Sequence, residues 1–248
     1  MKKKLLYRQV RAHLKSIEKY LCAYSKVAKP RYLHLMRLDI KIIKALFSFA
    51  KDLSKESYGT IDLKIIFQKA GEIREIQVMI KLLNSSLIIP EKLIDQLEKK
   101  EKDVKNQFLE NISKYIVIVK NFRKKMSFPI IVMDKEIIKS FFETELIKAN
   151  QKFQSNDREG LHQFRKSIKK LMFVYEALPK KIRNEVVLNK RQINRLQKKV
   201  GNWHDTYSAI DFLSNHYFLK IPTNFLSKLK KKEQKKFKAL FSDSYHFY

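Results

Sequence analysis

The sequence predicts an all-α protein built of long amphipathic helices. Only four Gly and five Pro interrupt its 248 residues, and these are the residues that most often end regular structure. Between them, apolar side chains recur every three to four residues over long stretches, which is the period of an amphipathic helix. No stretch shows the apolar–polar alternation of a half-buried strand. Helices alone are therefore expected.

Four helices are expected in the first half of the chain. The first covers residues 5–27 and ends before Pro30, and the second covers residues 31–55. Residues 57–60 form a turn in which Thr60 can cap a third helix running to residue 87. Pro90 fits the first turn of a fourth helix over residues 91–126, with apolar positions Leu93, Leu97, Val104, Phe108, Ile112, Tyr115 and Val119.

The stretch Ser127-Phe128-Pro129 breaks the helical pattern near the midpoint and predicts a boundary between residues 1–127 and 128–248. Four more helices are expected after it. Asp134 caps one that runs to residue 153, Asp157 opens one that stops at Pro179, a third covers residues 181–217, and Pro222 starts the last, with a lysine-rich face over Lys228–Lys238.

Two motifs occur twice, in the same order. His34 is followed by Arg at plus three, Ile at plus six and Lys at plus seven, and His162 is followed by the same residues. Residues 68–75, around Gly71, then pair with residues 198–205, around Gly201. The His-to-Gly separation is 71 − 34 = 37 in one half and 201 − 162 = 39 in the other. An internal duplication is the natural interpretation, so the two halves are expected to be two four-helix bundles.

Each His begins a basic stripe on a helix that is otherwise largely apolar. At about 100° per residue, Arg37, Lys41 and Lys44 fall within about 80° of His34. The second stripe repeats it with His162, Arg165 and Lys169, flanked by Lys166 and Lys170. Such a stripe faces solvent, a partner or a wet cavity. Asp39 falls inside the apolar arc, where the sequence does not explain it.

The helices that carry the two glycines add further charge. Lys69 and Arg74 lie near Gly71, while Arg191, Arg195 and Lys198 share one face before Gly201. A helical Gly costs about 1 kcal/mol relative to Ala. Two glycines at equivalent positions therefore suggest a close helix–helix approach that no larger side chain allows, with a helix break as the alternative.

The formal net charge of +29 favours a polyanionic partner. Nucleic acid, an anionic membrane surface and a phosphate polymer all qualify, although abundant Lys, Ile and Asn also fit a compositional bias. The single Cys22 forms no internal disulfide, and no Cys/His cluster offers a zinc site. Since neither a signal peptide nor an apolar run of roughly 18 residues is found, a soluble, cytoplasmic protein is expected.

Ordinary structural roles compete with each functional interpretation. A lone His is most often a satisfied side chain at the edge of a core, but two at equivalent positions beside Arg and Lys favour an anion site. A metal is disfavoured by the flanking cations, and a catalytic pair lacks an obvious nucleophile. Glu75 and Asp205 are expected to orient an Arg or cap a backbone, and Trp203 to be core. The Lys228–Lys238 run is expected to be a solvated helix face.

The doubled His-x-x-Arg and Leu-x-x-x-x-Gly-x-x-x-Asp motifs resemble the CHAD family (conserved histidine α-helical domain) over nearly the whole chain. Residues 195–205 are the closest match, whereas Glu75 replaces the family's Asp. Lys41, Lys44, Lys169 and Lys170 stand where the family usually has Arg, and Met172 replaces a basic residue. The resemblance implies two four-helix bundles related by a pseudo-twofold axis, with inorganic polyphosphate bound in a basic cavity or groove between them. Some relatives carry a triphosphate-tunnel enzyme domain, whose β-barrel sequence is absent here.

The sequence therefore predicts a stand-alone polyphosphate-binding module that is not an enzyme, with no cofactor, no metal and no catalytic residue. Its location is expected to be the cytoplasm, with polyphosphate granules as a candidate site. A nucleic-acid-binding basic helical protein is the alternative, and a phosphatase or polyphosphate hydrolase using His34 or His162 is the third. The predicted ligand-binding residues are His34, Arg37, Lys41, Lys44, Lys69, Arg74, His162, Arg165, Lys166, Lys169, Lys170, Arg191, Arg195, Lys198 and His204.

Overall fold

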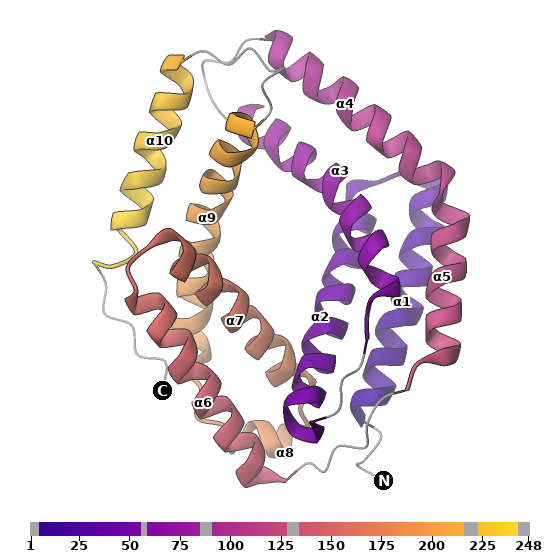
Figure 1. The fold of residues 1–248 in the computed structure, drawn as a ribbon, viewed down its shortest axis with the longest axis vertical. Helices are drawn as coiled ribbons and strands as arrows, with labels where there is room; N and C mark the ends of the chain where they lie inside the picture. Colours follow the sequence, from indigo (N-terminus) through magenta and orange to yellow (C-terminus); the bar gives the residue numbers. More distant parts are fainter. Residues whose placement is uncertain (1–4, 56–58, 85–90, 128–133, 216–222, 243–248) are drawn as a thin grey trace. The chain divides into compact units, whose positions relative to one another are not determined.

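A computed structural model describes residues 5–55, 59–84, 91–127, 134–215 and 223–242, and these residues form α-helices without a strand (Figure 1). The prediction of an all-α fold is confirmed. In chain order the helices are α1 (Leu5–Val27), α2 (Pro30–Ser54), α3 (Asp62–Asn84), α4 (Glu91–Glu110), α5 (Ile112–Lys125), α6 (Lys135–Gln154), α7 (Arg158–Ala177), α8 (Lys180–Arg183), α9 (Lys190–Asn215) and α10 (Thr223–Lys238).

The chain divides into two compact units that are not its two continuous halves. Unit 1 comprises Met1–Ile80, Leu97–Met133 and Phe173–Leu178, and unit 2 comprises Lys81–Gln96, Asp134–Met172 and Pro179–Tyr248. Helices α3, α4 and α7 therefore contribute residues to both units. The two-bundle arrangement and the boundary after residue 127 stay predictions.

Several predicted helix ends fall outside the described residues. The turn at 57–60 is described only from Gly59 onward, and the ends predicted at residues 87 and 217 lie beyond the described parts of α3 and α9. Pro90, Pro129 and Pro222 lie in the same undescribed stretches. The bounds of α1 and α2 agree with the prediction to within a residue.

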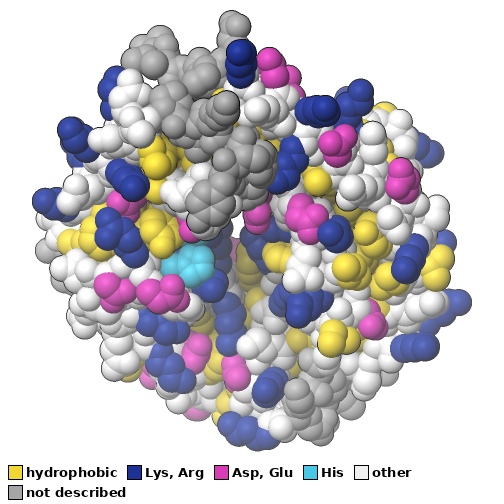
Figure 2. All heavy atoms as spheres, turned by 45° about the horizontal axis from the view of Figure 1, so that its top comes forward, with side chains coloured by type: hydrophobic (Ala, Val, Ile, Leu, Met, Phe, Trp, Pro, Cys, Tyr) yellow, Lys and Arg dark blue, Asp and Glu magenta, His cyan; other side chains and the backbone are white. Residues whose placement is uncertain are grey.

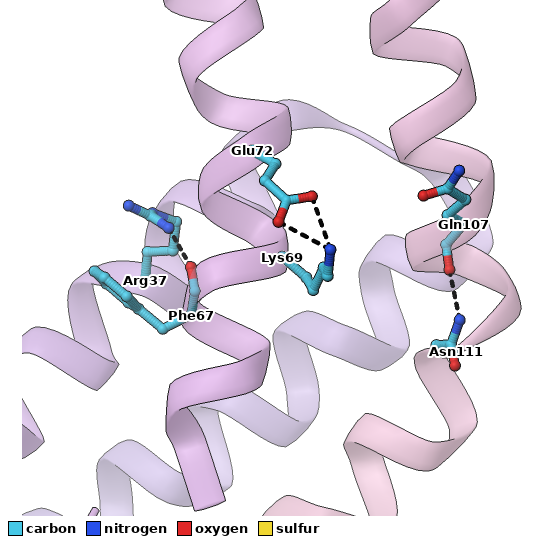
Figure 3. A network of polar contacts seen from close by, with 6 residues as sticks. All are labelled: Arg37, Phe67, Lys69, Glu72, Gln107 and Asn111. Atoms are coloured by element: carbon cyan, nitrogen blue, oxygen red, sulfur yellow. Dashed lines mark hydrogen bonds and ion pairs between the residues drawn. The ribbon is translucent and has the colours of Figure 1, made fainter. Parts of the chain in front are cut away.

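Two predicted helices are interrupted. The helix expected over 91–126 divides into α4 and α5 at Asn111, whose φ of −93° and ψ of 0° are not helical. The Asn111 side-chain amide donates to the Gln107 carbonyl over 2.9 Å (Figure 3), an acceptor that a continuous helix gives to a backbone N–H.

The helix expected over 181–217 divides into the short α8 and the long α9. The Asn189 side chain accepts a hydrogen bond from the Gln192 backbone N–H over 3.1 Å, which caps the start of α9. Capping by the two predicted aspartates is confirmed. Asp134 accepts from Ile137 N over 3.0 Å, and Asp157 accepts from Gly160 N over 2.8 Å.

The core of unit 1 forms where α1 packs on α2 and on α5. Tyr24 and Phe108 are buried and meet edge to face, with ring centroids 5.8 Å apart. Asp39, which the sequence left unexplained, is buried on α2 and lies 2.9 Å from His13 Nδ1 on α1. A buried carboxylate requires such a polar partner.

The core of unit 2 includes an anchor between α9 and α10. Trp203 is fully buried, as expected, and donates from Nε1 to Glu233 over 2.6 Å. Arg158 binds the same carboxylate through two hydrogen bonds of 3.0 and 2.9 Å. Glu233 is buried and is the one acidic residue of α10. The outer face of α10 carries the exposed lysines of the predicted solvated run, which are Lys228, Lys230, Lys231, Lys232, Lys235 and Lys238.

Candidate functional site

In unit 1, the basic stripe of α2 rests on an aromatic ring of α3. The Arg37 guanidinium donates from Nη1 to the backbone carbonyl of Phe67, and its Cζ lies 4.0 Å from the centre of the Phe67 ring (Figure 3). Lys44 Nζ lies 4.6 Å and Lys41 Nζ 5.9 Å from the same centre. The Phe67 ring therefore makes cation–π contacts with three of the predicted ligand-binding cations.

Gly71 makes room for Arg37. A Cβ atom at this position would overlap Arg37 Nη1 and would lie 3.2 Å from its Cζ. The space at this glycine is used, but by the guanidinium of Arg37 and not by the close helix–helix approach that the sequence predicted.

The same helix brings Arg74 into this α2–α3 cluster. Arg74 Nη1 donates to Gln77 Oε1 over 2.7 Å, and Gln77 Nε2 donates to Glu101 of α4 over 2.7 Å. Burial lowers the pKa of Arg37, the charge of Glu75 raises it, and the charge of Arg74 lowers it further. The sequence predicted that Glu75 would orient an Arg or cap a backbone, and its negative charge acts on Arg37.

The charged forms of the cluster's cations are destabilised by their surroundings. Burial lowers the pKa of Lys44, and the nearby Arg37 and Lys64 lower it further. Burial also lowers the pKa of Arg74, whereas Glu101 raises it. Since cations gather here on half-buried positions, an anion that reached them would stabilise their charged forms.

In unit 2, His162 of α7 and His204 of α9 are hydrogen-bonded to each other. His162 Nδ1 lies 2.9 Å from His204 Nε2, and the two ring planes differ by 15°. Ser208 Oγ lies 3.2 Å from His204 Nδ1, which extends the chain of contacts along α9. Burial lowers the pKa of His162, and the charges of Lys166 and Arg165 lower it further while Glu159 raises it.

Arg165 and Lys169 share one carboxylate of α9. Burial lowers the pKa of Arg165, and the charge of Asp205 raises it. Burial also lowers the pKa of Lys169; its neighbour Arg165 lowers it further, and Asp205 raises it. The Arg165 Nε atom is buried and has no hydrogen-bond partner among the described residues. This α7–α9 cluster therefore holds two half-buried cations beside one acid.

Gly201 differs from its counterpart Gly71. No described atom lies within 4 Å of the position that a Cβ would take at Gly201. The prediction of a close approach at both glycines is wrong for Gly201. The physical reason is that the Arg165 side chain does not enter this space as Arg37 enters the space beside Gly71.

Some predicted residues face away from these clusters. Lys69 pairs with Glu72 over 2.9 Å and lies on the opposite side of α3 from Arg37 (Figure 3). Lys170 points to α6, where its Nζ lies 3.9 Å from Glu145. Lys166 of α7 is exposed but lies close enough to His162 for its charge to lower the pKa of that side chain. The other exposed members are His34 on α2 and Arg191, Arg195 and Lys198 on α9.

Sequence reasoning missed Phe67 and Ser208. The aromatic ring at Phe67 follows from its register, since it stands four residues before Gly71 and so one turn away on the same side of α3. Ser208 stands four residues after His204 in the same way. In both cases the four-residue spacing from a predicted residue was visible in the sequence. Exposed serines and helical phenylalanines are so common, however, that this spacing alone does not identify a functional residue.

Basic side chains are not confined to the two clusters. Figure 2 shows Lys and Arg spread over one face of the molecule among acidic and hydrophobic side chains. In the part of the chain that the structure describes, no group of three or more His, Cys, Asp or Glu is placed to hold a metal ion. Within that same part, no helix is both long enough and apolar enough to cross a membrane.

Comparison with known proteins decides the family. The family model described as the CHAD domain matches residues 8–214 of this chain. The chain belongs to the CHAD family. The match ends within α9, so helix α10 of this CHAD protein lies outside the family model.

A solved structure shares the fold. The crystal structure of the CHAD domain from the plant Ricinus communis has a TM-score of 0.66 to this chain at 11% sequence identity, covering 97% of this chain and 85% of the plant chain. At this identity the likeness shows the fold alone. No curated protein matches the sequence.

Proposed function

We propose that this CHAD protein binds inorganic polyphosphate through the α7–α9 cluster and the α2–α3 cluster. One observation carries the proposal: half-buried Arg and Lys side chains in each cluster have pKa values lowered by burial, with few carboxylates beside them. A polyphosphate chain carries about one negative charge per phosphate and no bases. It can therefore be held by charge and by Arg and Lys hydrogen bonds.

The first test removes the arginine at the centre of each cluster. Changing Arg37 and Arg165 together to Ala is expected to weaken binding of fluorescently labelled long-chain polyphosphate at least tenfold, measured by anisotropy at fixed salt. The matched control changes Lys228 and Lys230 of α10 to Ala, which removes the same charge from exposed positions. Equal weakening in both double variants would show binding by net charge alone and would contradict the assigned site.

The expectation that both clusters hold one ligand chain stays a prediction, and the single variants test it. If one chain engages both arginines, the effects of Arg37→Ala and Arg165→Ala are coupled, because loss of either contact frees part of the same ligand. Two independent sites would instead give additive effects and two binding events.

Nucleic acid is the competing polyanion, since the net charge of +29 attracts it as well. Polyphosphate is favoured because it needs only phosphate contacts. In a competition experiment at equal phosphate concentration, single-stranded DNA or RNA is expected to displace labelled polyphosphate poorly. Efficient displacement would assign the clusters to nucleic acid instead.

We propose binding rather than catalysis for the histidine pair. The order Ser208, His204, His162 resembles a serine nucleophile beside a base, but the group that orients the base is normally a carboxylate that stabilises the imidazolium. Here that position is held by His162, whose own cationic form is disfavoured by Lys166 and Arg165. Purified protein is therefore expected to release no phosphate from polyphosphate. Phosphate release by the wild-type protein that disappears in Ser208→Ala or His204→Ala would overturn the proposal that the histidine pair is not catalytic.

A further inference from the structure

Helix α10 presents a dense positive surface that lies outside the family model. We call its exposed lysines the α10 lysine face, and they are Lys228, Lys230, Lys231, Lys232, Lys235 and Lys238. The other exposed residues of α10 are uncharged, and its one acidic residue, Glu233, is buried. Like charges three and four residues apart disfavour a helix. An anion lying on the α10 lysine face would relieve this repulsion.

An exposed aromatic ring belongs to the neighbouring helix α9. Tyr207 is 36% exposed, more than any other aromatic residue that the structure describes. Its ring stacks on the buried Trp203, with the ring centroids 5.4 Å apart and the ring planes at 21°. A ring that is fixed by packing and still reaches solvent is suited to stacking against a nucleobase.

Arg158 of α7 connects this ring to α10. Its Cζ lies 5.1 Å from the centre of the Phe237 ring on α10, and its charge interacts with Tyr207. Lys230 precedes Phe237 by seven residues and so lies on the same side of α10. Helices α9 and α10 pack side by side and run in opposite directions (Figure 1). Tyr207, one turn after Trp203, therefore lies towards the Lys230 end of α10.

These contacts favour single-stranded nucleic acid over other anionic partners. A helix that lies on a bilayer inserts its apolar face, but the apolar side of α10 is buried in the protein at Phe225 and Leu229. Polyphosphate has no bases and gains no stacking energy from an aromatic ring. A single strand offers phosphates to lysines and unpaired bases to a ring.

We propose that Tyr207 and the α10 lysine face form a binding surface for single-stranded nucleic acid. The lysines contact the phosphates, and one base stacks on Tyr207. Lys228 and Lys238 lie about 15 Å apart along the helix axis, which is long enough to follow several phosphates of one strand. The surface uses no residue of the α2–α3 or α7–α9 cluster, so it stands or falls independently of polyphosphate binding.

Fluorescence anisotropy with labelled oligothymidylate and oligouridylate of about 12 nucleotides tests the role of the ring for DNA and RNA separately. Tyr207→Leu is expected to weaken the tighter of the two complexes at least fivefold, because Leu keeps an apolar contact with Trp203 but offers no face for stacking. Tyr207→Phe keeps the ring and is expected to bind within twofold of the wild type. If Tyr207→Leu binds both oligonucleotides as the wild type does, no base stacks here and the proposal is wrong.

The role of the lysines is tested by the salt dependence of the same binding. Changing Lys230 and Lys231 to Gln is expected to reduce the slope of log affinity against log salt by about 1.4, since each phosphate contact to a single strand contributes about 0.7. The matched control changes Lys124 and Lys125, which are consecutive exposed lysines of α5. Equal reductions in both variants would show attraction by net charge alone and would contradict the assigned surface.

A measurement on the wild-type protein guards against variants that do not fold. Trp203 is the only tryptophan in the chain and stacks on Tyr207, so a base bound at Tyr207 is expected to quench its fluorescence. An abasic strand of the same length carries the same charge and is expected to quench less. Equal quenching by both strands would overturn the proposal. Binding to phosphatidylserine vesicles that is lost in the Lys230 and Lys231 variant, without quenching by either strand, would assign the α10 lysine face to a membrane instead.

Discussion

Arg37 and Arg165 occupy equivalent positions in the repeat, yet their guanidinium groups meet different surroundings. Arg37 is bound to Phe67 on α3, whereas Arg165 retains a buried Nε without a described partner. The sequence motif alone treats the two as equals. What distinguishes them is the residue four positions before each glycine, which no pattern of charges reveals.

The two glycines test this difference without any ligand. Gly201→Ala is expected to raise the free energy of unfolding by up to about 1 kcal/mol, because Ala is the better helix former and nothing is displaced. Gly71→Ala is expected to fall short of that gain by about 1 kcal/mol or more, since its Cβ displaces Arg37 from Phe67.

Urea unfolding followed by circular dichroism measures both changes. In an Arg37→Ala background the cost of a Cβ at Gly71 should disappear, and Gly71→Ala should then stabilise the protein as Gly201→Ala does. Equal stabilisation by both substitutions in the wild-type background would contradict the role assigned to Gly71.

His162 predicts a loss of stability in mild acid. Its pKa is lowered in the folded protein, first by burial and then by Lys166 and Arg165. The unfolded chain, with an ordinary histidine pKa of about 6.5, therefore takes up a proton at a higher pH than the folded protein does. The stability that neutral His162 contributes is therefore fully present above about pH 6.5. It is lost as the pH falls from there towards the pKa of His162 in the folded protein.

Urea unfolding at pH 7.5 and pH 5 measures this contribution. His162→Gln is expected to reduce the difference in unfolding free energy between the two pH values. Ser208→Ala keeps both imidazoles and is expected to retain the difference. An unchanged pH dependence in His162→Gln would assign the acid sensitivity to other groups.

At the scale of the helix, sequence reasoning succeeded where the signal is local. Asp134 and Asp157 cap helices as predicted, because an N-cap needs only one side chain and the backbone next to it. It failed at Asn111 and Asn189, where an Asn side chain competes with the helical backbone in a stretch whose apolar period continues. The period of the apolar residues shows which face of a helix is buried. It does not show whether the helical backbone is continuous through that stretch.

The candidate site was predictable to a similar extent. The two stripes follow from spacing along their helices. The coupling of Arg165 to Asp205 and the fit of Arg37 beside Gly71 join residues of different helices, and the sequence predicted only that an acid would orient an Arg or cap a backbone. The orientation of Lys69 towards Glu72, and of Lys170 towards Glu145, depends on partners in tertiary structure or one turn away. Charge patterns cannot choose between such a partner and a ligand.

Helix α10 is predicted to depend on Glu233 for its attachment. Glu233→Ala leaves the buried Trp203 Nε1 without its acceptor and Arg158 without its bidentate partner, at an expected cost of about 1–3 kcal/mol of unfolding free energy. Glu185→Ala removes an exposed pair with Lys135 and is expected to cost less than about 1 kcal/mol. Chemical denaturation of both variants measures the contrast, and equal losses would show that the anchor contributes no more than a surface pair.

At the scale of the whole molecule, the net charge of +29 acts on the folded state itself. Like charges repel, so such an excess destabilises a compact chain, and dissolved salt reduces the repulsion. The six exposed lysines of α10 add to it at i, i+3 and i, i+4 spacings, where like charges disfavour the helix. The buried anchor of Glu233 with Arg158 and Trp203 opposes this repulsion.

Salt is therefore expected to stabilise the protein, and α10 to supply part of the effect. Replacing Lys228, Lys230, Lys231, Lys232, Lys235 and Lys238 by Gln lowers the net charge to 29 − 6 = 23. The Debye length is about 30 Å at 10 mM NaCl, where exposed charges repel one another, and about 4 Å at 500 mM, where they are screened. The rise in melting temperature between these two salt concentrations is expected to be smaller in this variant than in the wild type. The variant should also be the more stable of the two at 10 mM. If the wild-type melting temperature does not rise with salt, self-repulsion is not what limits the stability of this fold, and the lysine face of α10 carries no energetic cost.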